Sequence, residues 1–211
     1  MRDALRPAPE LSPRAPRRPF GALGEREIFF RHWLSNPLGI GAVLPSGDSV
    51  ARAMAREIAL DRPGAVLELG GGTGSLTRGL IAAGCPPERL VVIEREPALA
   101  RHLQQRLPGV RVICGDAGDT QSLLAAAGIE RLATVVSSLP IKWFPRALQH
   151  AVLDAAFAAL GEDGAFIQLT NALASPIPAA EFGLIGEEVT RIWFHILPVQ
   201  IWRYRRAGTP S

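Results

Sequence analysis

The residues of this sequence that are best suited to bind a ligand or take part in a reaction are acids and glycines in or just after short apolar runs. The first group is VLELGGGTGS, residues 66–75, in which the run contains Glu68 and leads into a glycine-rich turn. Glycine permits a tight turn and lets the backbone come close to a bound nucleoside. A dinucleotide fingerprint would need glycine or alanine where Ser75 stands, and Glu68 would repel a pyrophosphate. The turn therefore predicts a nucleoside ligand that carries a cationic amine. Its expected contacts are Glu68, Gly70, Gly72, Thr73 and Gly74.

Three later apolar runs also end in residues that could bind a ligand. VVIE ends in Glu94, 20 residues after Gly74, and an acid at the end of a second strand is where ribose hydroxyls are held. CGDA, residues 114–117, ends the third run, and SSLP, residues 137–140, ends the fourth. The carboxyl ends of the strands in an open α/β sheet border one ligand crevice. Four such motifs in order predict a single nucleoside site, with Arg95 as a further contact beside Glu94.

A nucleoside with ribose hydroxyls and a cationic amino group describes S-adenosylmethionine, whose sulfonium makes its methyl group electrophilic. A nucleophile needs only to be held in line with the S–CH3 bond, so positioning is the main task of the site. The fourth motif is expected to face the methyl group, with Ser137 also in contact with the cofactor. Its methyl-transfer residues are Ser137, Leu139 and Pro140. The sequence assigns no general base, and neither a Ser–His–acid arrangement nor a metal cluster is expected.

The elements that position these motifs alternate along the chain. Short continuous apolar runs predict strands, and apolar residues at helical spacing predict helices. The expected strands cover residues 65–69, 90–94, 110–114, 133–137 and 165–170. The expected helices cover residues 24–35, 49–60, 74–83, 97–107, 120–127 and 145–160. This alternation predicts a parallel sheet covered on both faces.

The last part of the chain breaks the alternation. Residues 187–195 and 199–206 are rich in β-forming residues and predict an antiparallel pair joined by Leu197 and Pro198. Five strand–helix units followed by a hairpin resemble the Rossmann-like fold of the class I methyltransferases over about residues 49–206. The expected fold class is therefore α/β, with a mostly parallel seven-stranded sheet, a C-terminal antiparallel hairpin and additional N-terminal helices.

Length and composition indicate one well-filled domain, because 211 residues with 47% hydrophobic content are too few for two. Residues 1–20 are rich in arginine and proline and predict a flexible arm. Residues 21–48 predict an amphipathic helix and loop, and residues 49–211 the methyltransferase domain. No apolar run is long enough for a membrane span or a secretory signal, which favours the cytoplasm. Both cysteines, Cys85 and Cys114, are expected to be buried free thiols.

The charge distribution points to an anionic partner. Residues 1–20 and residues 198–211 each sum to +3, so the rest of the chain carries −3 of the net +3. Basic ends on a mildly acidic body suggest contact with a lipid surface or with nucleic acid. The alternative interpretation is that both ends are simply solvated.

Within the class I methyltransferases, the chain resembles the small, peripheral bacterial phospholipid N-methyltransferases, distant relatives of the ribosomal RNA adenine dimethyltransferases. The resemblance runs through FFRHWLSNPLGIGAVLPS (29–46), ELGGGTG (68–74), GDA (115–117), SSLPIKWFP (137–145), QLT (168–170), Trp193, Pro198 and WRYR (202–205). It implies S-adenosylmethionine as the methyl donor, with S-adenosylhomocysteine as the product. It implies methylation of the phosphatidylethanolamine amine, in up to three steps, toward phosphatidylcholine. It also implies that Asp116 holds the adenine amino group and that Ala117 lends a backbone N–H.

Some positions depart from this family pattern. Gly71 stands where the family has proline, and Ser138 where it has glycine. Asn171 replaces an aromatic residue, and Leu197 and Val199 stand where a second proline is expected. Because the changes at 171 and 197 lie near the expected substrate side, an ornithine-type aminolipid is an alternative acceptor.

Aromatic and basic residues supply the expected membrane and substrate contacts. An arginine-rich arm beside a helix with Phe29, Phe30 and Trp33 is typical of an interfacial anchor, although such a helix could instead cover a sheet edge. Trp143, together with Phe144, could face the ammonium product by cation–π attraction, or could simply pack. Lipid phosphate contacts, with solvent exposure as the alternative, are expected from Arg31, His32 and Lys142.

These residues predict a monomeric enzyme, peripherally associated with the inner face of the membrane, that binds a phospholipid head group and an anionic membrane surface. Neither a metal nor a stable nucleic-acid partner is expected. The nearest rival is an RNA adenine methyltransferase, whose fourth motif usually offers an amide and an aromatic ring to a flipped base. Ser138 and Ile141 stand at those positions here. A non-catalytic binding module is the other rival, and intact acids at positions 68, 94 and 116 argue against it.

Overall fold

The computed structural model describes residues 47–171, 174–194 and 197–208. The chain divides into two units, Met1–Val43 and Leu44–Ser211, and all the described residues belong to the second unit. The expected arm and the expected helix at 24–35 lie outside the described residues. The same holds for the expected contacts Phe29, Phe30, Arg31, His32 and Trp33.

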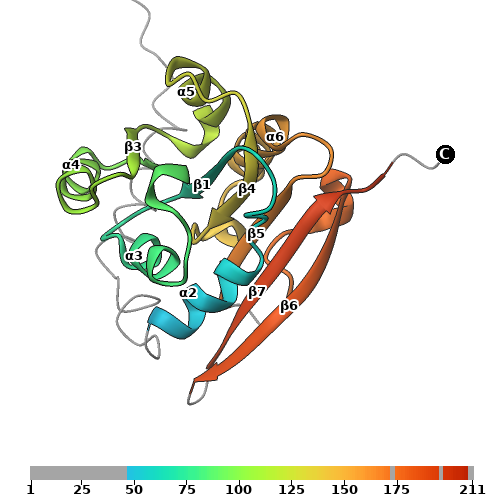
Figure 1. Cartoon of the computed structure of the whole chain (residues 1–211). Coiled ribbons are helices and arrows are strands. Elements are labelled where there is room, and N and C mark those ends of the chain that lie inside the picture. Colours follow the sequence, from blue (N-terminus) through green and yellow to red (C-terminus); the bar gives the residue numbers. More distant parts are fainter. Residues whose placement is uncertain (1–46, 172–173, 195–196, 209–211) are drawn as a thin grey trace, which may run out of the picture. The chain divides into compact units, whose positions relative to one another are not determined.

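One seven-stranded sheet organises the second unit, with the strand order β3-β2-β1-β4-β5-β7-β6 (Figure 1). The parallel strands are β1 (Ala65–Leu69), β2 (Leu90–Glu94), β3 (Arg111–Cys114), β4 (Leu132–Ser137) and β5 (Ala165–Thr170). The two antiparallel strands are β6 (Leu184–Phe194) and β7 (Leu197–Arg206), and β7 lies between β5 and β6. This arrangement confirms the expected Rossmann-like fold class, including the C-terminal hairpin.

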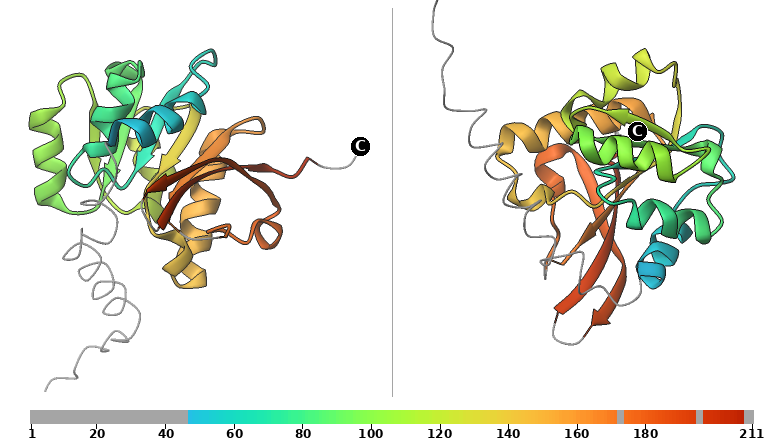
Figure 2. Two further views of the ribbon diagram at one scale, coloured as in Figure 1. Left: turned by 90° about the horizontal axis from the view of Figure 1, so that it is seen from below. Right: turned by 90° about the vertical axis from the view of Figure 1, so that its left-hand side faces the viewer.

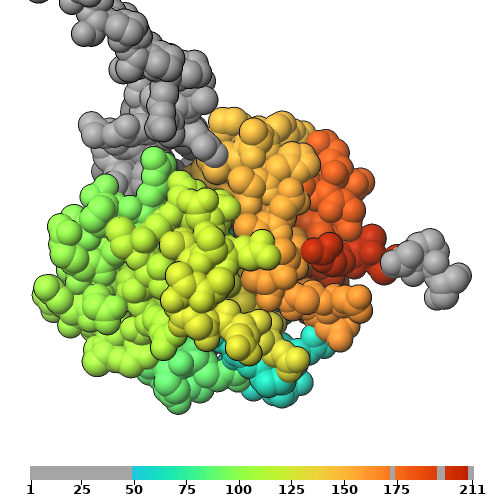
Figure 3. Space-filling view, turned by 90° about the horizontal axis from the view of Figure 1, so that it is seen from above, coloured from blue at the N-terminus to red at the C-terminus, as the bar shows by residue number. Residues whose placement is uncertain are grey.

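Helices cover both faces of the sheet, because continuous apolar strands present side chains that need burial on each side. One face carries α2 (Gly47–Arg56), α3 (Ser75–Ala82) and α4 (Pro97–Arg106). The other carries α5 (Thr120–Ala126) and α6 (Arg146–Leu160). In the left view of Figure 2, α6 lies on the opposite side of the strands from α2 and α4. The space-filling view in Figure 3 passes from green over α4 through yellow over α5 and orange over α6 to the red end of β7.

Short 3-10 helices, which the sequence did not predict, link several strands and helices. They are η2 (Pro87–Arg89), η3 (Ala117–Asp119), η4 (Ile141–Trp143) and η5 (Ala179–Phe182). The helix α2 ends at Arg56 and not at Leu60 as expected, and beyond it the N–H of Ala59 donates to Oγ1 of Thr134 at 3.1 Å, not to a helical carbonyl. The 3-10 helix η2 fixes the turn that follows. The Arg89 guanidinium of η2 donates hydrogen bonds to the carbonyls of Leu60, Arg62 and Gly64, at 2.6–3.0 Å, and so holds 60–64 as a turn.

The expected turn of the C-terminal hairpin was wrong. Leu197 and Pro198 belong to β7, where Leu197 pairs with Phe194 and Pro198 with Trp193, so only residues 195–196 separate the two strands. Proline lacks an N–H donor, but it is tolerated near the beginning of a strand, where few ladder hydrogen bonds are lost.

One of the two cysteine predictions was also wrong. Cys85 is buried, as expected, but Cys114 is exposed. Cys114 ends β3, which is the outermost strand on its side of the sheet among the described residues. An edge strand of this kind leaves side chains open to solvent even where the sequence reads as apolar.

Candidate active site

The glycine-rich turn after β1 contacts the expected methyl-transfer loop directly. Gly70 has φ +81°, a conformation that favours glycine, and its N–H donates to the carbonyl of Ile93 at 2.9 Å. A Cβ at Gly70 would lie 2.5 Å from Cδ2 of Leu139. The hydroxyl of Ser138 donates to the carbonyl of Gly70 at 3.3 Å. The turn and the loop after β4 therefore fit together only if residue 70 has no side chain.

Glu94 joins two loops at the carboxyl edge of the sheet. Its carboxylate is 2% exposed, and it accepts hydrogen bonds from the backbone N–H groups of Gly72 and Glu96, each at 2.8 Å. A carboxylate has more lone pairs than these two bonds use. Glu94 can therefore shape the glycine turn and still accept hydrogen bonds from ribose hydroxyls.

Glu68 is a buried carboxylate with no partner among the described residues. It is fully buried, and neither its two oxygens nor the nearby buried hydroxyl of Thr77 has a partner with the geometry of a hydrogen bond, although Thr77 is close enough to affect the pKa of Glu68. The pKa of Glu68 is raised to about 8, mainly because the side chain is buried. The nearby Thr77 hydroxyl lowers this pKa by less than burial raises it, and the Glu94 carboxylate also raises it. A buried polar group without a partner is rare in proteins and points to a missing ligand. A cationic amine is the chemical group that would satisfy this carboxylate.

Asp116 begins η3 and lies beside Arg95. Its Oδ1 accepts a hydrogen bond from the N–H of Gly118 at 2.9 Å, and its Oδ2 lies 3.7 Å from Nε of Arg95. The side chains of Asp116 and Arg95 are 37% and 38% exposed. Two expected cofactor contacts therefore lie together, on a partly open part of the edge next to Ala117.

The loop after β4 is held by buried polar groups. Ser137 is buried, and its Oγ accepts a hydrogen bond from the N–H of Leu139 at 3.2 Å. The carbonyl of Leu139 accepts hydrogen bonds from Nε2 of Gln168, at 2.9 Å, and from the N–H of Ile141, at 2.8 Å. Pro140 follows and is half-buried. This geometry gives the loop one defined conformation.

Gln168 was not among the expected site residues. It is 1% exposed, at the carboxyl end of β5, and its Oε1 has no hydrogen-bond partner. Gln200 of β7 is also fully buried, and its Nε2 has no partner. A glutamine within an otherwise apolar strand (AFIQLT) is the sequence signal that could have identified Gln168, because an amide is costly to bury without a role.

The residues of η4 separate into exposed and buried ones. Trp143 is 65% exposed, and Nζ of Lys142 lies 5.6 Å from the centre of its ring. Phe144 is 8% exposed and belongs to the apolar core on the α6 side of the sheet. Ordinary packing therefore accounts for Phe144, whereas Trp143 faces solvent.

All four motifs meet at the carboxyl edge of the central strands. This edge carries a buried unpaired carboxylate, a second carboxylate that orders the glycine turn, a partly exposed acid and a rigid loop. The described residues hold no group of three or more His, Cys, Asp or Glu side chains that could bind a metal ion. No helix in the part of the chain that the structure describes is long and apolar enough to cross a membrane.

Comparison with known proteins supports the same fold. The TrkA-N domain family matches residues 65–142, which is less than half of the chain and covers β1 through η4. Among solved structures, 1,6-didemethyltoxoflavin-N1-methyltransferase of Burkholderia thailandensis superposes with a TM-score of 0.63. It is 17% identical, and the match covers 90% of this chain and 93% of that one. Magnesium protoporphyrin IX methyltransferase of Synechocystis PCC 6803, with bound S-adenosylmethionine, has a TM-score of 0.61 and 13% identity, covering 88% of this chain and 99% of that one.

Two relatives are more similar in sequence. The ornithine lipid N-methyltransferase of Singulisphaera acidiphila is 34% identical over 146 residues, which cover 68% of this chain and 74% of that protein. The ribosomal RNA small subunit methyltransferase A of Myxococcus xanthus is 34% identical over 116 residues. That match covers 54% of this chain but only 39% of the relative. The fold, the edge geometry and the first of these relatives together show that the chain belongs to the class I S-adenosylmethionine-dependent methyltransferases.

Proposed function

We propose that the protein transfers methyl groups from S-adenosylmethionine to the amine of a membrane aminolipid. The observation that carries the cofactor part is Glu68, a buried carboxylate without a partner beside a turn that only glycine can form. The lipid part is supported by the similarity to an ornithine lipid N-methyltransferase. The two candidate acceptors are phosphatidylethanolamine, on the way to phosphatidylcholine, and an ornithine-type lipid.

The residues on the carboxyl edge fit this cofactor. Glu68 would accept hydrogen bonds from its amino group, and Glu94 from its ribose hydroxyls. Asp116 would hold the adenine amino group, with Ala117 contributing a backbone N–H. The remaining contacts would come from the glycine turn and from Thr73, Arg95 and Ser137. When bound, the cofactor supplies an electrophilic methyl group.

The chain's own task is to position the acceptor amine. The loop of Ser137, Leu139 and Pro140 would border the reacting methyl group, and Gln168 keeps the Leu139 carbonyl in place through its 2.9 Å hydrogen bond. A well-oriented pair of reactants gains several kcal/mol over free encounter, roughly 7–11 in the most favourable intramolecular cases. Lys142 and Trp143 would contact the lipid head group, and the monomer would work at the inner face of the membrane.

The proposal is tested by offering several acceptors side by side. Labelled S-adenosylmethionine would be incubated with the full chain and with vesicles of phosphatidylethanolamine, vesicles of ornithine lipid, or ribosomal RNA. We expect label in one of the lipids, and a loss of at least about tenfold in the Glu94→Gln variant, which weakens ribose binding. Label in RNA alone would assign the chain to the RNA-modifying relatives. Tight cofactor binding without transfer to either lipid would overturn the acceptor assignment.

A further inference from the structure

Two tryptophans project from the described part of the molecule. Trp143 is 65% exposed and Trp193 is 66% exposed, whereas Trp202 is packed against the core. The other large apolar side chains that are exposed among the described residues are Leu60 and Ile185. A tryptophan with two thirds of its surface in water is costly, since its large ring prefers an apolar environment with a polar boundary.

Each of these exposed rings has a cation above it. Nζ of Lys142 lies 5.6 Å from the ring of Trp143, and the guanidinium carbon of Arg191 lies 6.0 Å from the ring of Trp193. Glu188 holds Arg191 with two hydrogen bonds of 2.7 Å. The same combination, an exposed indole with a cation on its face, therefore occurs twice.

Strand register places both pairs at the carboxyl edge of the sheet. Thr170, the last residue of β5, lies opposite Gln200, which in turn lies opposite Arg191. Trp193 lies two residues further toward the hairpin tip. η4, with Lys142 and Trp143, follows the carboxyl end of β4. Both exposed indoles are thus on the edge that carries the four ligand-binding motifs.

The Arg191–Trp193 pair is on the α6 side of the sheet, and η4 borders the apolar core on that same side. Side chains alternate along β7, so Gln200 lies on the same face as Tyr204, which belongs to the core under α6. Arg191 pairs with Gln200 and shares that face, and Trp193 is on it as well, two residues along. The η4 turn sends Ile141 and Phe144 into the same core. With β5 and β7 between β4 and β6, these two strands are roughly 15 Å apart across the sheet, at about 5 Å per strand, and Trp193 lies further along β6 toward the hairpin tip.

We propose that these two tryptophan–cation pairs dock the carboxyl edge of the sheet onto an anionic phospholipid bilayer. Indole rings settle at the boundary between head groups and acyl chains, and a lysine such as Lys142 beside such a ring attracts lipid phosphates. Two anchors on one edge would hold the methyl-transfer loop between them against the surface that contains the acceptor amine. This inference rests on the proposed lipid substrate, and it assigns the docking surface to residues outside the N-terminal segment.

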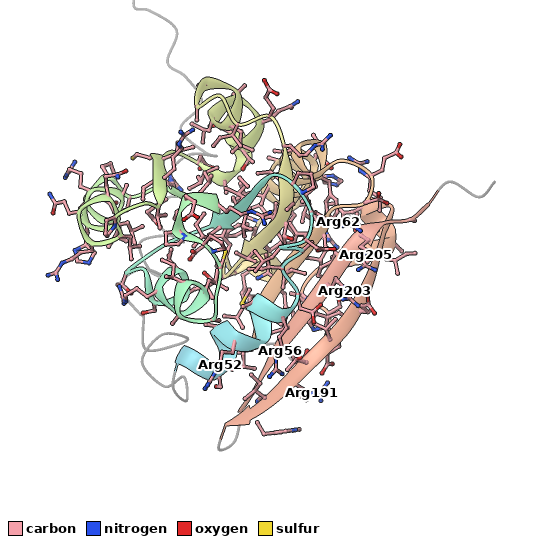
Figure 4. All side chains as sticks on the ribbon, in the orientation of Figure 1. Arg52, Arg56, Arg62, Arg191, Arg203 and Arg205 are labelled. Carbon is pink, nitrogen blue, oxygen red and sulfur yellow. The ribbon has the colours of Figure 1, made fainter. Side chains whose placement is uncertain are left out.

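The chemistry of the surface favours a bilayer over nucleic acid. Binding to nucleic acid depends on many unpaired cations that neutralise phosphates. At the hairpin, Glu188 already neutralises Arg191. Figure 4 labels further arginines. Arg52 and Arg56 belong to α2, which packs on the opposite face of the sheet from α6. Arg62 and Arg205 lie at the other end of the hairpin from Arg191, and Arg203 is bound to two acids. Exposed apolar area is therefore the larger contribution at the catalytic edge.

The test is sedimentation of the full chain with vesicles of phosphatidylcholine containing phosphatidylglycerol. The double variant Trp143→Ala/Trp193→Ala is expected to bind about tenfold more weakly or worse, because apolar area buried in the interface sets the affinity. Ile185→Ala is the matched control: Ile185 is 61% exposed on the same hairpin but pairs with Arg205, at the opposite end. It is expected to bind like the wild type. Unchanged affinity in the double variant, or an equal loss in Ile185→Ala, would overturn the proposal.

Two further measurements separate this inference from the proposed function. The shift in melting temperature on adding S-adenosylhomocysteine is expected to be the same in the double variant and the wild type, since neither tryptophan is a cofactor contact. For the single variant Trp193→Ala, methyl transfer to a short-chain, monomeric aminolipid is expected to keep its kcat, while transfer to vesicles falls, because Trp193 is not among the proposed contacts of the head group. Vesicle binding that depends on both tryptophans without lipid methylation would support the docking surface and reject the acceptor. Loss of RNA binding in the double variant, with no vesicle binding in the wild type, would reject the docking surface.

Discussion

At the scale of single residues, Glu68 is the one acid among the described residues whose buried side-chain oxygens lack a hydrogen-bond partner. Its environment disfavours the charged form, and the folded protein therefore keeps a proton that the unfolded chain releases. A carboxylate in this position is suited to a positively charged ligand, because the charge of the ligand stabilises the ionised form that burial disfavours. The same residue makes the stability of the ligand-free protein depend on pH.

Glu68→Gln should remove that pH dependence. The pKa of Glu68 is about 8 in the folded state against an ordinary value of 4.5, so its contribution to stability is complete below pH 4.5 and is lost as the pH rises toward 8. The loss is on the order of 5 kcal/mol at most, at about 1.4 kcal/mol per pKa unit. Denaturant unfolding at pH 5 and pH 8 measures it. Glutamine has no proton to lose, so the variant should lose less stability than the wild type, and equal losses in both proteins would contradict the raised pKa.

At the scale of elements, the placement of the C-terminal hairpin against α2 depends on one arginine. Arg203 of β7 donates to Glu57, just after α2, and to Glu187 of β6, each at 2.7 Å (Figure 4). The hydrogen bond from Arg203 lowers the pKa of Glu187, and the acid in turn raises the pKa of Arg203. Three segments that are distant in sequence are thus joined by a single side chain.

Arg203→Met should destabilise the protein by about 1–2 kcal/mol, because it leaves the mostly buried Glu57 carboxylate without its partner. The difference from wild type should shrink as the pH falls below the ordinary carboxylate pKa, since the lowered pKa of Glu187 stabilises the protein only while that acid is charged. Arg205→Met, an exposed position on the same face of β7, is the control and should change stability by less than about 0.5 kcal/mol. Equal effects of the two substitutions, measured by denaturant unfolding, would contradict the bridging role.

Elements with a strong local pattern were predictable from the sequence. The runs at 65–69, 90–94 and 165–170 form strands with the expected bounds, because short, mostly apolar runs that are buried on both faces have few alternatives. The helix that begins with Pro97 was also predictable, since proline is favoured in a first turn. Local pattern and final structure agree in the central sheet because the apolar residues that favour a strand locally are also the ones that packing on both faces stabilises.

Features that depend on distant contacts were not predictable. Just after the end of α2, the N–H of Ala59 donates to Thr134, 75 residues away, and the exposure of Cys114 follows from the position of β3 at the sheet edge. The partners of the methyl-transfer loop depend on Gln168, which only the pairing of β4 with β5 brings near Leu139. The acids at 68, 94 and 116 were identifiable because their strand-end positions are local. The contacts of Glu68, or their absence, required the fold.

At the scale of the whole molecule, one half of the sheet carries the residues proposed to bind the cofactor, and the other half carries those proposed to bind the acceptor. Strands β1 to β3 carry the acids proposed to hold the cofactor, and the edge from β4 to β6 carries the methyl-transfer loop, both exposed tryptophans and the hairpin. The TrkA-N match covers residues 65–142, which comprise β1 to β4 and the loop after β4, and leaves β5, β6 and β7 outside it. Acceptor specificity should therefore lie in the second half.

This division predicts where ligand binding changes the dynamics of the molecule. Adding S-adenosylhomocysteine at about 100 times its Kd should stabilise the protein by about 2.7 kcal/mol and raise its melting temperature. Beyond that global effect, amide hydrogen exchange should slow most at 68–74, 94–96, 114–118 and 137–140, where the motifs border the proposed site. The exposed hairpin strand at 184–192 should change least. Glu94→Gln at the same ligand concentration should lose most of both effects, because Glu94 orders the glycine turn as well as facing the ribose. Protection centred on the hairpin would instead place the cofactor in the acceptor half, and the assignment of Glu68, Glu94 and Asp116 would be wrong.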